Sequence, residues 1–308
     1  YLFIALFTTY YYTRMISRVE RYTIITGKGY RPRLLDLGRW RAAAFSLVVF
    51  YLFFAIALPF LVFLYTSFLG FLQAPSAQAF ATLTLKNYRF LAQYGEVASA
   101  LQNTLWMVLI TATSTVVLSF FVSLVVVRSK FWGRKLLDQL AFLPHAIPGI
   151  VMGIAFFWVF LKIDFLPIYG TIWAMSIGFT VGFLSYGTRS MNAALLQVHK
   201  ELEEAAYVSG ARPWRTLWRV FLPLMMPSFV GVWIWVILHA VRIAGLPLIL
   251  YEGPQNQVLS ILIWNMWDEG YVPAVAAIGT LLMLALLLLT LAVRYIGFRR
   301  QLVQLPNL

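Results

Sequence analysis

Six apolar runs, each long enough to cross a lipid bilayer, limit what this chain can fold into. About 20 apolar residues in a helix span the roughly 30 Å of hydrocarbon, and a helix satisfies its own backbone hydrogen bonds there. The composition agrees, with 61% hydrophobic and 11% charged residues, against about 45–50% and 25% in soluble domains. The sequence therefore predicts an all-α polytopic membrane protein with spans at 43–69, 104–127, 140–161, 171–190, 227–249 and 272–296.

The positions of the basic residues predict which side of the membrane each loop occupies, because cytoplasmic loops are enriched in Lys and Arg. The loops at 128–139 and about 195–224 and the end of the chain hold most of them. Six crossings place these regions on one side, so both ends of a six-span core over 43–300, with its tail at 301–308, are expected in the cytoplasm. The net charge of +13 thus flanks spans instead of forming a face, which argues against nucleic-acid binding.

Two segments precede the first predicted span. Residues 1–13 are apolar but too short to cross a bilayer, and their charges follow the run instead of preceding it. They are therefore interpreted as the tail of a preceding, truncated transmembrane helix and not as a signal peptide. Residues 14–42 are rich in Arg and Lys, with Glu20 and Asp36 as their acids. This segment is predicted to be a basic cytoplasmic linker.

The loop before the fifth span carries the most informative local pattern. Lys200 to Ser209 is predicted as a short polar helix with acids near its start, where the helix dipole favours them. Gly210 is expected to end it, as glycine does after a helix. A second short helix is predicted from Pro213, a residue tolerated at a first helical position, to about Leu222, with Pro223 stopping it.

This loop resembles the signature of permease subunits of bacterial ABC importers of the binding-protein-dependent type. That signature is Glu-Ala-Ala, three residues, Gly, nine residues, an aliphatic residue, any residue and Leu-Pro. Every fixed position is present here: Glu204, Ala205, Ala206, Gly210, Val220, Leu222 and Pro223. An ordinary amphipathic helix at a membrane surface is the alternative interpretation.

The resemblance implies a type I permease core in a bacterial inner membrane, with residues of about 195–224 as the coupling loop. It also implies three protein partners: a dimer of cytoplasmic ATP-binding subunits, a periplasmic solute-binding protein, and a second permease half, fused upstream or separate. ATP and Mg would be bound by the ATPase, so this chain would need no cofactor. Glu204 would face basic groups of the ATPase, Ala205 and Ala206 would pack into its cleft, and Gly210 would hold the bend.

The solute is predicted less directly. The segments 26–32 and 250–254 are similar to those of fused permeases of the ferric-iron branch, so ferric iron is the first expectation. Thiamine, polyamines and organophosphonates follow it. Members of the ferric branch often carry Arg-Glu in the fifth span, whereas here Arg242 is followed by Ile243. Because this chain has no acid at that position, a carboxylate there cannot take part in binding the solute, and this absence argues against ferric iron.

No pattern of catalytic or metal-binding residues is present, and the chain has no cysteine. An enzyme activity in this chain is therefore not predicted. His239 and Arg242 are three residues apart in the fifth run and are predicted to share a helical face. They either form hydrogen bonds within the bundle or line a translocation path. Gly149 and Gly153 have the spacing that lets helices approach closely, which serves packing or the same path.

Two other functional classes are weighed against the permease. A secondary transporter or channel would work without ATP, but such carriers place coupling acids inside their spans, and here the acids lie mostly in loops. Arg189, near the inner end of the fourth run, is interpreted as an anchor that reaches the membrane interface. A passive scaffold for a cytoplasmic enzyme is the remaining alternative, which only activity measurements can separate from a permease.

Overall fold

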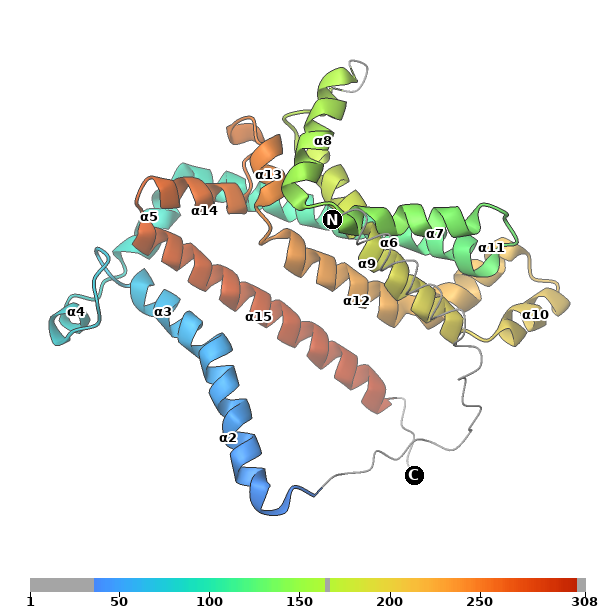
Figure 1. Cartoon of the computed structure of the whole chain (residues 1–308), viewed down its shortest axis with the longest axis horizontal. Helices are drawn as coiled ribbons and strands as arrows, with labels where there is room; N and C mark the ends of the chain where they lie inside the picture. Colours follow the sequence, from blue (N-terminus) through green and yellow to red (C-terminus); the bar gives the residue numbers. More distant parts are fainter. Residues whose placement is uncertain (1–35, 164–166, 304–308) are drawn as a thin grey trace. The chain divides into compact units, whose positions relative to one another are not determined.

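The computed structural model describes residues 36–163 and 167–303, and every regular element in that part of the chain is a helix (Figure 1). The predicted all-α fold is therefore confirmed. The chain divides into two compact units, one formed by residues up to Gln93 and from Met266 onward, the other by Tyr94–Asn265. The predicted helix tail at 1–13, most of the linker at 14–42 and residues 304–308 of the predicted tail lie outside the described residues.

The first unit joins a long apolar helix to the last helix of the chain. The rings of Phe90 and Tyr271 stack with centroids 5.5 Å apart, and Asn87 Nδ2 donates to the carbonyls of Ser67 and Leu69 at 2.8 and 2.7 Å. These contacts fix the end of the first long helix. The elements of this unit are η2 (Gly38–Trp40), α2 (Arg41–Leu52), η3 (Phe53–Ala57), α3 (Leu58–Ser67), α4 (Ala77–Ala81), α5 (Lys86–Gln93) and α15 (Val272–Val303).

The second unit contains the predicted coupling loop. Its elements are α6 (Gly95–Arg128), α7 (Arg134–Phe142), η4 (Leu143–Ala146), α8 (Gly149–Lys162), α9 (Ile172–Gln197), α10 (Lys200–Val208), α11 (Pro213–Thr216), η5 (Leu217–Phe221), α12 (Leu222–Ala240), α13 (Gly245–Leu250) and η6 (Pro254–Asn256). Helix α14 (Leu259–Asp268) begins in this unit and ends in the first.

Helices α6 and α9 form the centre of the second unit and pack through small side chains. Thr111, Thr115, Ser119 and Ser123 follow one another at every fourth position of α6, on one face, and all are fully buried. A Cβ added to Gly187 of α9 would meet the side chains of Ser119 and Thr115. Small residues on both helices therefore allow the close approach, as is common between membrane helices.

Two π-helical turns carry long helices past a proline. The turn η3 ends two residues before Pro59, and the turn η5 ends two residues before Pro223. A proline has no N–H to donate and clashes with the preceding turn, but a π-helical turn shifts the hydrogen-bond pattern so that the helix continues. The prediction that Pro223 stops a helix is therefore wrong, because Pro213–Ala240 is one continuous helical segment.

Four helical segments of the described residues are long and apolar enough to cross a membrane. They are Gly38–Ser67, Gly95–Arg128, Pro213–Ala240 and Val272–Val293. Helix α9 has 26 residues, a length of about 39 Å at 1.5 Å per residue, but its Ser, Thr and Asn residues and Arg189 lower its hydropathy. A fifth candidate exists if the bent pair described next is one span. Six crossings therefore stay a prediction.

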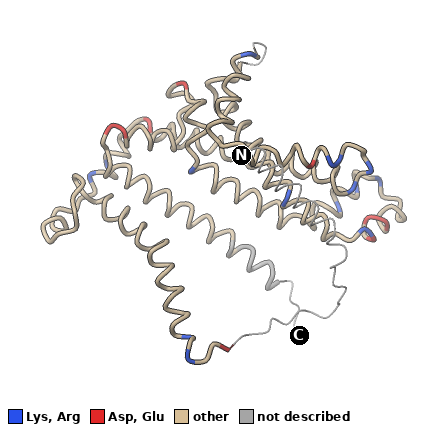
Figure 2. Tube along the Cα trace, viewed as in Figure 1, with Lys and Arg blue, Asp and Glu red and all other residues tan. Residues whose placement is uncertain are grey.

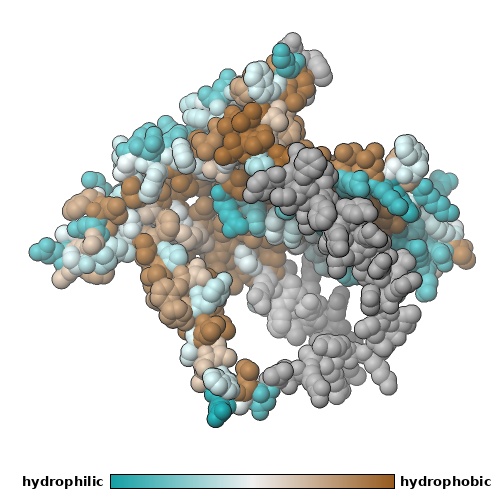
Figure 3. All heavy atoms as spheres, in the orientation of Figure 1, coloured by the Kyte–Doolittle hydropathy of each residue, from teal (hydrophilic) through white to brown (hydrophobic). Residues whose placement is uncertain are grey.

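Two predicted spans are not continuous helices. Arg134–Ala146 and Gly149–Lys162 meet at a bend of 110°, where Pro144 and Pro148 interrupt the run predicted at 140–161. The apolar face of α8 beyond this break is exposed (Figure 3). The fifth run, predicted at 227–249, ends as a helix at Ala240, and α13 follows a short turn. Pro247, in the first turn of α13, has no N–H for the carbonyl of Ile243 and disfavours a straight helix across residues 243–247.

Candidate coupling loop

Helix α10 presents two different faces. Glu201, Glu204, Ala205 and Val208 are spaced as one helical face, and all are exposed. Glu203 and Ala206 lie on the other side and are half-buried. Glu201 and Glu203 lie in the first turn, where the positive end of the helix dipole favours them. Of the Glu-Ala-Ala triplet of the signature, Glu204 and Ala205 thus face outward, and Ala206 faces the body of the unit.

Gly210 ends α10 in the predicted manner. Its φ is +75°, in the left-handed region that favours glycine. The N–H of Gly210 donates to the carbonyl of Tyr207, and that of Ala211 donates to the carbonyl of Ala206, both at 2.9 Å. This pair of hydrogen bonds is a Schellman motif, which satisfies carbonyls at the helix end. The bend in the loop is therefore set by backbone conformation at one residue.

The remaining signature residues lie where the loop re-enters the long helix. Val220 belongs to the π-helical turn η5 and is half-buried, as is Leu222 at the start of α12, whereas Pro223 is exposed. Charged residues gather at the α10 and α11 end of the second unit, and few occur along the middle of α6 and α12 (Figure 2). The signature therefore ends where the π-helical hydrogen bonds of η5 give way to those of α12 and charged residues become rare.

Arg128, the last residue of α6, contacts three segments that carry or flank the loop. Its Nη2 donates to the carbonyl of Leu195 at 2.9 Å and to that of Val198, both at the end of α9. Its Nε lies 4.0 Å from Glu203 Oε2, and its guanidinium carbon lies 5.6 Å from the centre of the Phe221 ring. The phenol of Tyr207 donates to Glu203 at 3.3 Å. Burial and then the negative charge of Glu203 raise the pKa of Tyr207 above its usual value.

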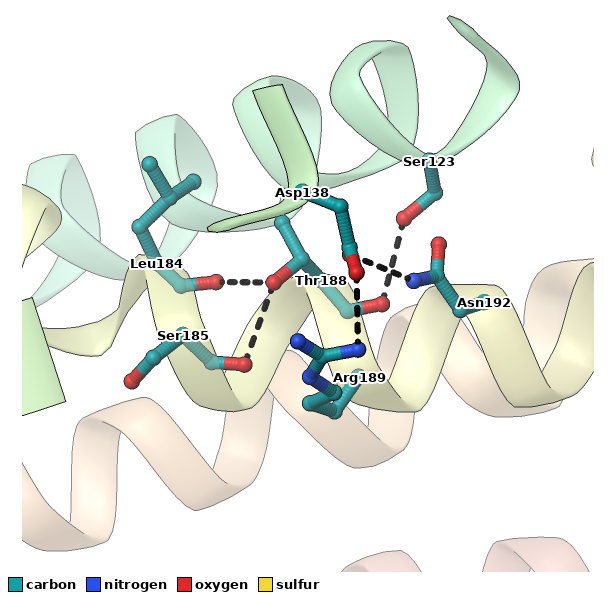
Figure 4. Close-up of polar contacts among 7 residues, drawn as sticks. All are labelled: Ser123, Asp138, Leu184, Ser185, Thr188, Arg189 and Asn192. Atoms are coloured by element: carbon teal, nitrogen blue, oxygen red, sulfur yellow. Dashed lines mark hydrogen bonds and ion pairs between the residues drawn. The ribbon is translucent and has the colours of Figure 1, made fainter. Parts of the chain in front are cut away.

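A second polar cluster joins α7 to α9 (Figure 4). Arg189 Nη1 forms an ion pair with Asp138 Oδ2 at 3.2 Å, and Asn192 Nδ2 donates to Asp138 Oδ1 at 3.3 Å. The Arg189 guanidinium also lies 4.8 Å from the centre of the Phe142 ring. Arg189 thus pairs with a carboxylate of α7 while 27% of its side chain stays exposed, and its role as an interfacial anchor stays a prediction. Ser123 of α6 donates to the carbonyl of Thr188 beside this cluster.

The predicted path residues do not form one group. His239 is half-buried, and its Nδ1 donates to the carbonyl of Trp235 at 2.8 Å. The imidazole also stacks on the Trp235 ring, with centroids 3.8 Å apart. Arg242 is exposed in the turn after α12. The prediction that His239 and Arg242 share a helical face is therefore wrong. The helix ends between them.

The two glycines of the predicted path also differ. A Cβ on Gly153 would lie 3.1 Å from Ile249 of α13, so this glycine lets α8 and α13 pack closely. Gly149 is exposed, and a Cβ there would meet nothing within 4 Å. Within the described residues, no group of three or more His, Asp or Glu side chains could hold a metal ion.

Comparison with known protein families accounts for the coupling-loop pattern. The family described as "Binding-protein-dependent transport system inner membrane component" matches residues 115–301, more than half of the chain. The chain belongs to this family. As a member of the permease family, it carries the signature loop between α9 and α12, within the matched range.

Curated relatives of this permease have names that refer to different solutes. The ferric transport system permease protein FbpB of Actinobacillus pleuropneumoniae is 28% identical over 215 residues, 68% of this chain and 31% of that protein. A putative FbpB of Haemophilus influenzae is 35% identical over 155 residues, 49% and 24% of the two chains. The probable sulfate transport system permease protein cysT of Nephroselmis olivacea is 30% identical over 214 residues, 64% and 74%. The chain thus spans about a third or less of the ferric relatives.

Solved structures of ABC importers share the fold of this permease. A bacterial ABC transporter involved in the import of the acidic polysaccharide alginate matches with a TM-score of 0.66 at 15% identity, over 93% of this chain and 99% of that one. The MetNI methionine ABC transporter in inward-facing conformations matches with a TM-score of 0.53 at 19% identity, over 69% and 95%. At such identities the likeness shows the fold alone, that of a type I ABC importer permease.

Sequence reasoning missed the side chains that attach the loop of this permease to its helices. Arg128 was considered only as one of the basic residues of the loop at 128–139, and Asp138 and Asn192 were not considered. Arg128 follows a long apolar run directly, and Asp138 is the acid among several basic residues. These positions were available as signals, but the sequence does not say which carbonyls or side chains they meet.

Proposed function

We propose that this chain is the membrane-spanning permease subunit of an ABC importer that moves a solute into the cytoplasm. A periplasmic binding protein delivers the solute, and a separate pair of ATPase subunits binds ATP and Mg and supplies the energy. The membership of the family and the intact signature loop support this proposal. A second permease half, fused upstream or separate, completes the pathway, in a bacterial inner membrane with both ends of the six-span core cytoplasmic.

The single observation that carries the proposal is the exposed face of α10. Glu204 and Ala205 stand on it beside Val208, which is 90% exposed. Leu202 and Tyr207 of the same helix are exposed as well, and several apolar side chains exposed together outside a span favour a surface that another protein covers. In the proposed complex, basic groups of the ATPase pair with Glu204, and its cleft receives Ala205 and Val208. Ala206 supports this helix from the inner side.

The path of the solute is proposed less specifically. His239 and its stack with Trp235 line it from α12, and Arg242 follows the end of that helix. Gly149 leaves space beside the start of α8, and Gly153 lets α8 pack against α13 along the path. Ferric iron is the first candidate, since relatives named for ferric transport match and the segments 26–32 and 250–254 are similar to that branch. Sulfate is the second, because a relative named for it matches over most of its length.

The experiment is an ATPase and uptake assay on the complex reconstituted in lipid, with iron-binding and sulfate-binding periplasmic proteins added in turn. Wild type is compared with Glu204→Arg, and Glu269→Arg, an exposed acid in the first unit, is the matched control. Reversing a charge at an interface costs several kcal/mol, so stimulated hydrolysis is expected to fall by tenfold or more, as an order of magnitude.

Each outcome has a defined meaning. Loss of stimulation in Glu204→Arg with a normal Glu269→Arg supports coupling through α10, and the ligand of the stimulating protein identifies the solute. Solute movement without any associated ATPase would contradict the permease proposal and support an ATP-independent carrier or channel.

A further inference from the structure

One side chain, that of Arg128, contacts the coupling loop at both of its ends. The chain leaves α9 at Val198 and returns to the long helix at Phe221, and Arg128 contacts both places. Arg128 also lies beside Glu203, in the first turn of α10. The side chain of Arg128 is only 11% exposed, so these contacts are formed away from bulk solvent.

An arginine suits this position for a physical reason. The carbonyls at the end of a helix carry partial negative charge, and those of Leu195 and Val198 lie at the end of α9. A guanidinium has a planar fork of five N–H donors, is always charged and stacks on aromatic rings. It can therefore bond carbonyls, approach a carboxylate and lie against a ring at once, whereas a lysine offers one compact ammonium.

We infer that Arg128 is the positioning residue that fixes the coupling loop to α6, so that a displacement of α10 moves α6 together with α9. This inference rests on the proposed function, since it specifies how the loop passes its movement to the spans. Helix α6 is packed along α9 through the buried Thr and Ser face, which makes the two helices move as one body. Without the arginine, the loop bends about its two ends and the displacement is lost.

The test measures ATP hydrolysis and solute uptake of the reconstituted complex, with and without the binding protein, in wild type, Arg128→Gln, Arg128→Lys and Glu204→Arg. Arg134→Gln is the matched control, because Arg134 lies six residues further on, is exposed, and donates only within its own turn, to the carbonyl of Ser129 at 3.0 Å. The readout is the ratio of stimulated to basal hydrolysis, together with the KM for ATP.

Arg128→Gln is expected to lower the stimulated-to-basal ratio by about fivefold or more, the range of typical coupling energies between sites. Its basal hydrolysis and its KM for ATP stay unchanged, since the ATPase subunits are untouched, whereas a merely misfolded permease loses basal activity of the complex as well. Arg128→Lys retains the charge and is expected to recover about half of the ratio, because it keeps part of the carbonyl bonding. Arg134→Gln behaves as wild type.

The outcomes separate this inference from the proposed function. If Glu204→Arg abolishes stimulation and Arg128→Gln leaves the ratio at the wild-type value, the inference is wrong and the proposed function stands. If neither variant changes the ratio, stimulation does not pass through α10, and both the inference and the interface proposed on α10 are wrong. If the binding protein does not stimulate hydrolysis by the wild-type complex, the proposed function itself is wrong. If Arg128→Gln does not accumulate in the membrane, Arg128→Lys decides, and an unchanged ratio in that variant contradicts the inference.

Discussion

Helix α6 is attached to a loop at each end, and the two attachments differ in chemistry. Near its beginning, Asn103 Nδ2 donates to the carbonyls of Gln255 and Gln257 at 3.2 and 2.9 Å, and Thr104 accepts from the N–H of Leu259 at 2.7 Å. At its end, Arg128 bonds the end of α9 and contacts the coupling loop. The attachments are about 38 Å apart along the helix at 1.5 Å per residue.

The difference indicates what each attachment does. The attachment near the beginning of α6 is neutral and includes the fully buried Asn256. Its amide oxygen accepts from the N–H groups of Glu252 and Gly253, and its Nδ2 donates to the carbonyl of Leu250. The charged one leaves Arg128 Nε buried without a hydrogen bond, 4.0 Å from Glu203. A set of satisfied neutral bonds contributes to stability, whereas a charged group with an unused donor can rearrange when its surroundings change. The neutral attachment is therefore expected to set stability and the charged one to set coupling.

The largest expected effect on stability is at the neutral attachment. Asn256→Ala removes three hydrogen bonds and leaves buried backbone groups unpaired, so the free energy of unfolding is expected to fall by about 3 kcal/mol. Thermal unfolding of the purified permease measures it. Gln255→Ala, at the exposed neighbouring amide, is the control and is expected to change stability by less than about 0.5 kcal/mol. Equal stability of the two variants would contradict this role of Asn256.

A smaller loss is expected where α6 and α9 touch between the attachments. In Gly187→Ala the new Cβ lies within 2.9 Å of Ser119 Cβ, and such overpacking costs about 2 kcal/mol. Gly182→Ala is the same change in the same helix, but its Cβ lies 3.6 Å from Met152 Sδ, an ordinary contact. It is expected to be neutral or to stabilise by up to about 1 kcal/mol, because alanine favours a helix. Thermal unfolding of the two purified variants is the measurement, and the melting temperature of Gly187→Ala is expected to be the lower one.

Within the coupling loop, Gly210→Val is expected to act on conformation and not on packing. No atom lies within 4 Å of the position of a Cβ on Gly210, but a left-handed backbone costs an L-residue about 1–2 kcal/mol. The variant should insert normally and hydrolyse ATP without transport. Gly210→Asn is the control, since asparagine tolerates this conformation. Wild-type uptake by Gly210→Val would show that the bend is not required.

The smallest expected effect is that of Glu203→Gln. The pair with Arg128 is 4.0 Å apart and Glu203 is 22% exposed, and such pairs contribute less than about 1 kcal/mol. The ratio of stimulated to basal hydrolysis should fall by less than about twofold, consistent with the weak pair. If Glu203→Gln uncouples as fully as Arg128→Gln, then the ion pair, and not the carbonyl bonds, fixes the loop.

Local signals in the sequence predicted much of the fold and the shape of the loop. Gly210 ends α10 as predicted, because this effect depends on the backbone of one residue. The continuation of the helix through Pro223 was not predicted. It depends on a π-helical turn, and no residue type specifies such a turn by itself.

The attachments of the loop could not be predicted for a different reason. The contacts of Arg128 join residues about 70 positions apart in sequence, and a count of charges gives only the side of the membrane. His239 and Arg242 were expected on one face because the run looked continuous, but α12 ends at Ala240, between them. Whether a side chain lines a path or packs inside depends on the arrangement of the helices.

The measurement that tests the central claim most directly is the distance between α6 and α10 in the assembled complex. The chain has no cysteine, so Phe121→Cys on α6 and Leu202→Cys on α10, both at exposed positions, take spin labels without background. Pulsed electron paramagnetic resonance is expected to give one narrow distance distribution in the otherwise wild-type chain and with Arg134→Gln, and a broad one with Arg128→Gln. The same narrow distribution in all three would contradict the claim that Arg128 fixes the coupling loop to α6.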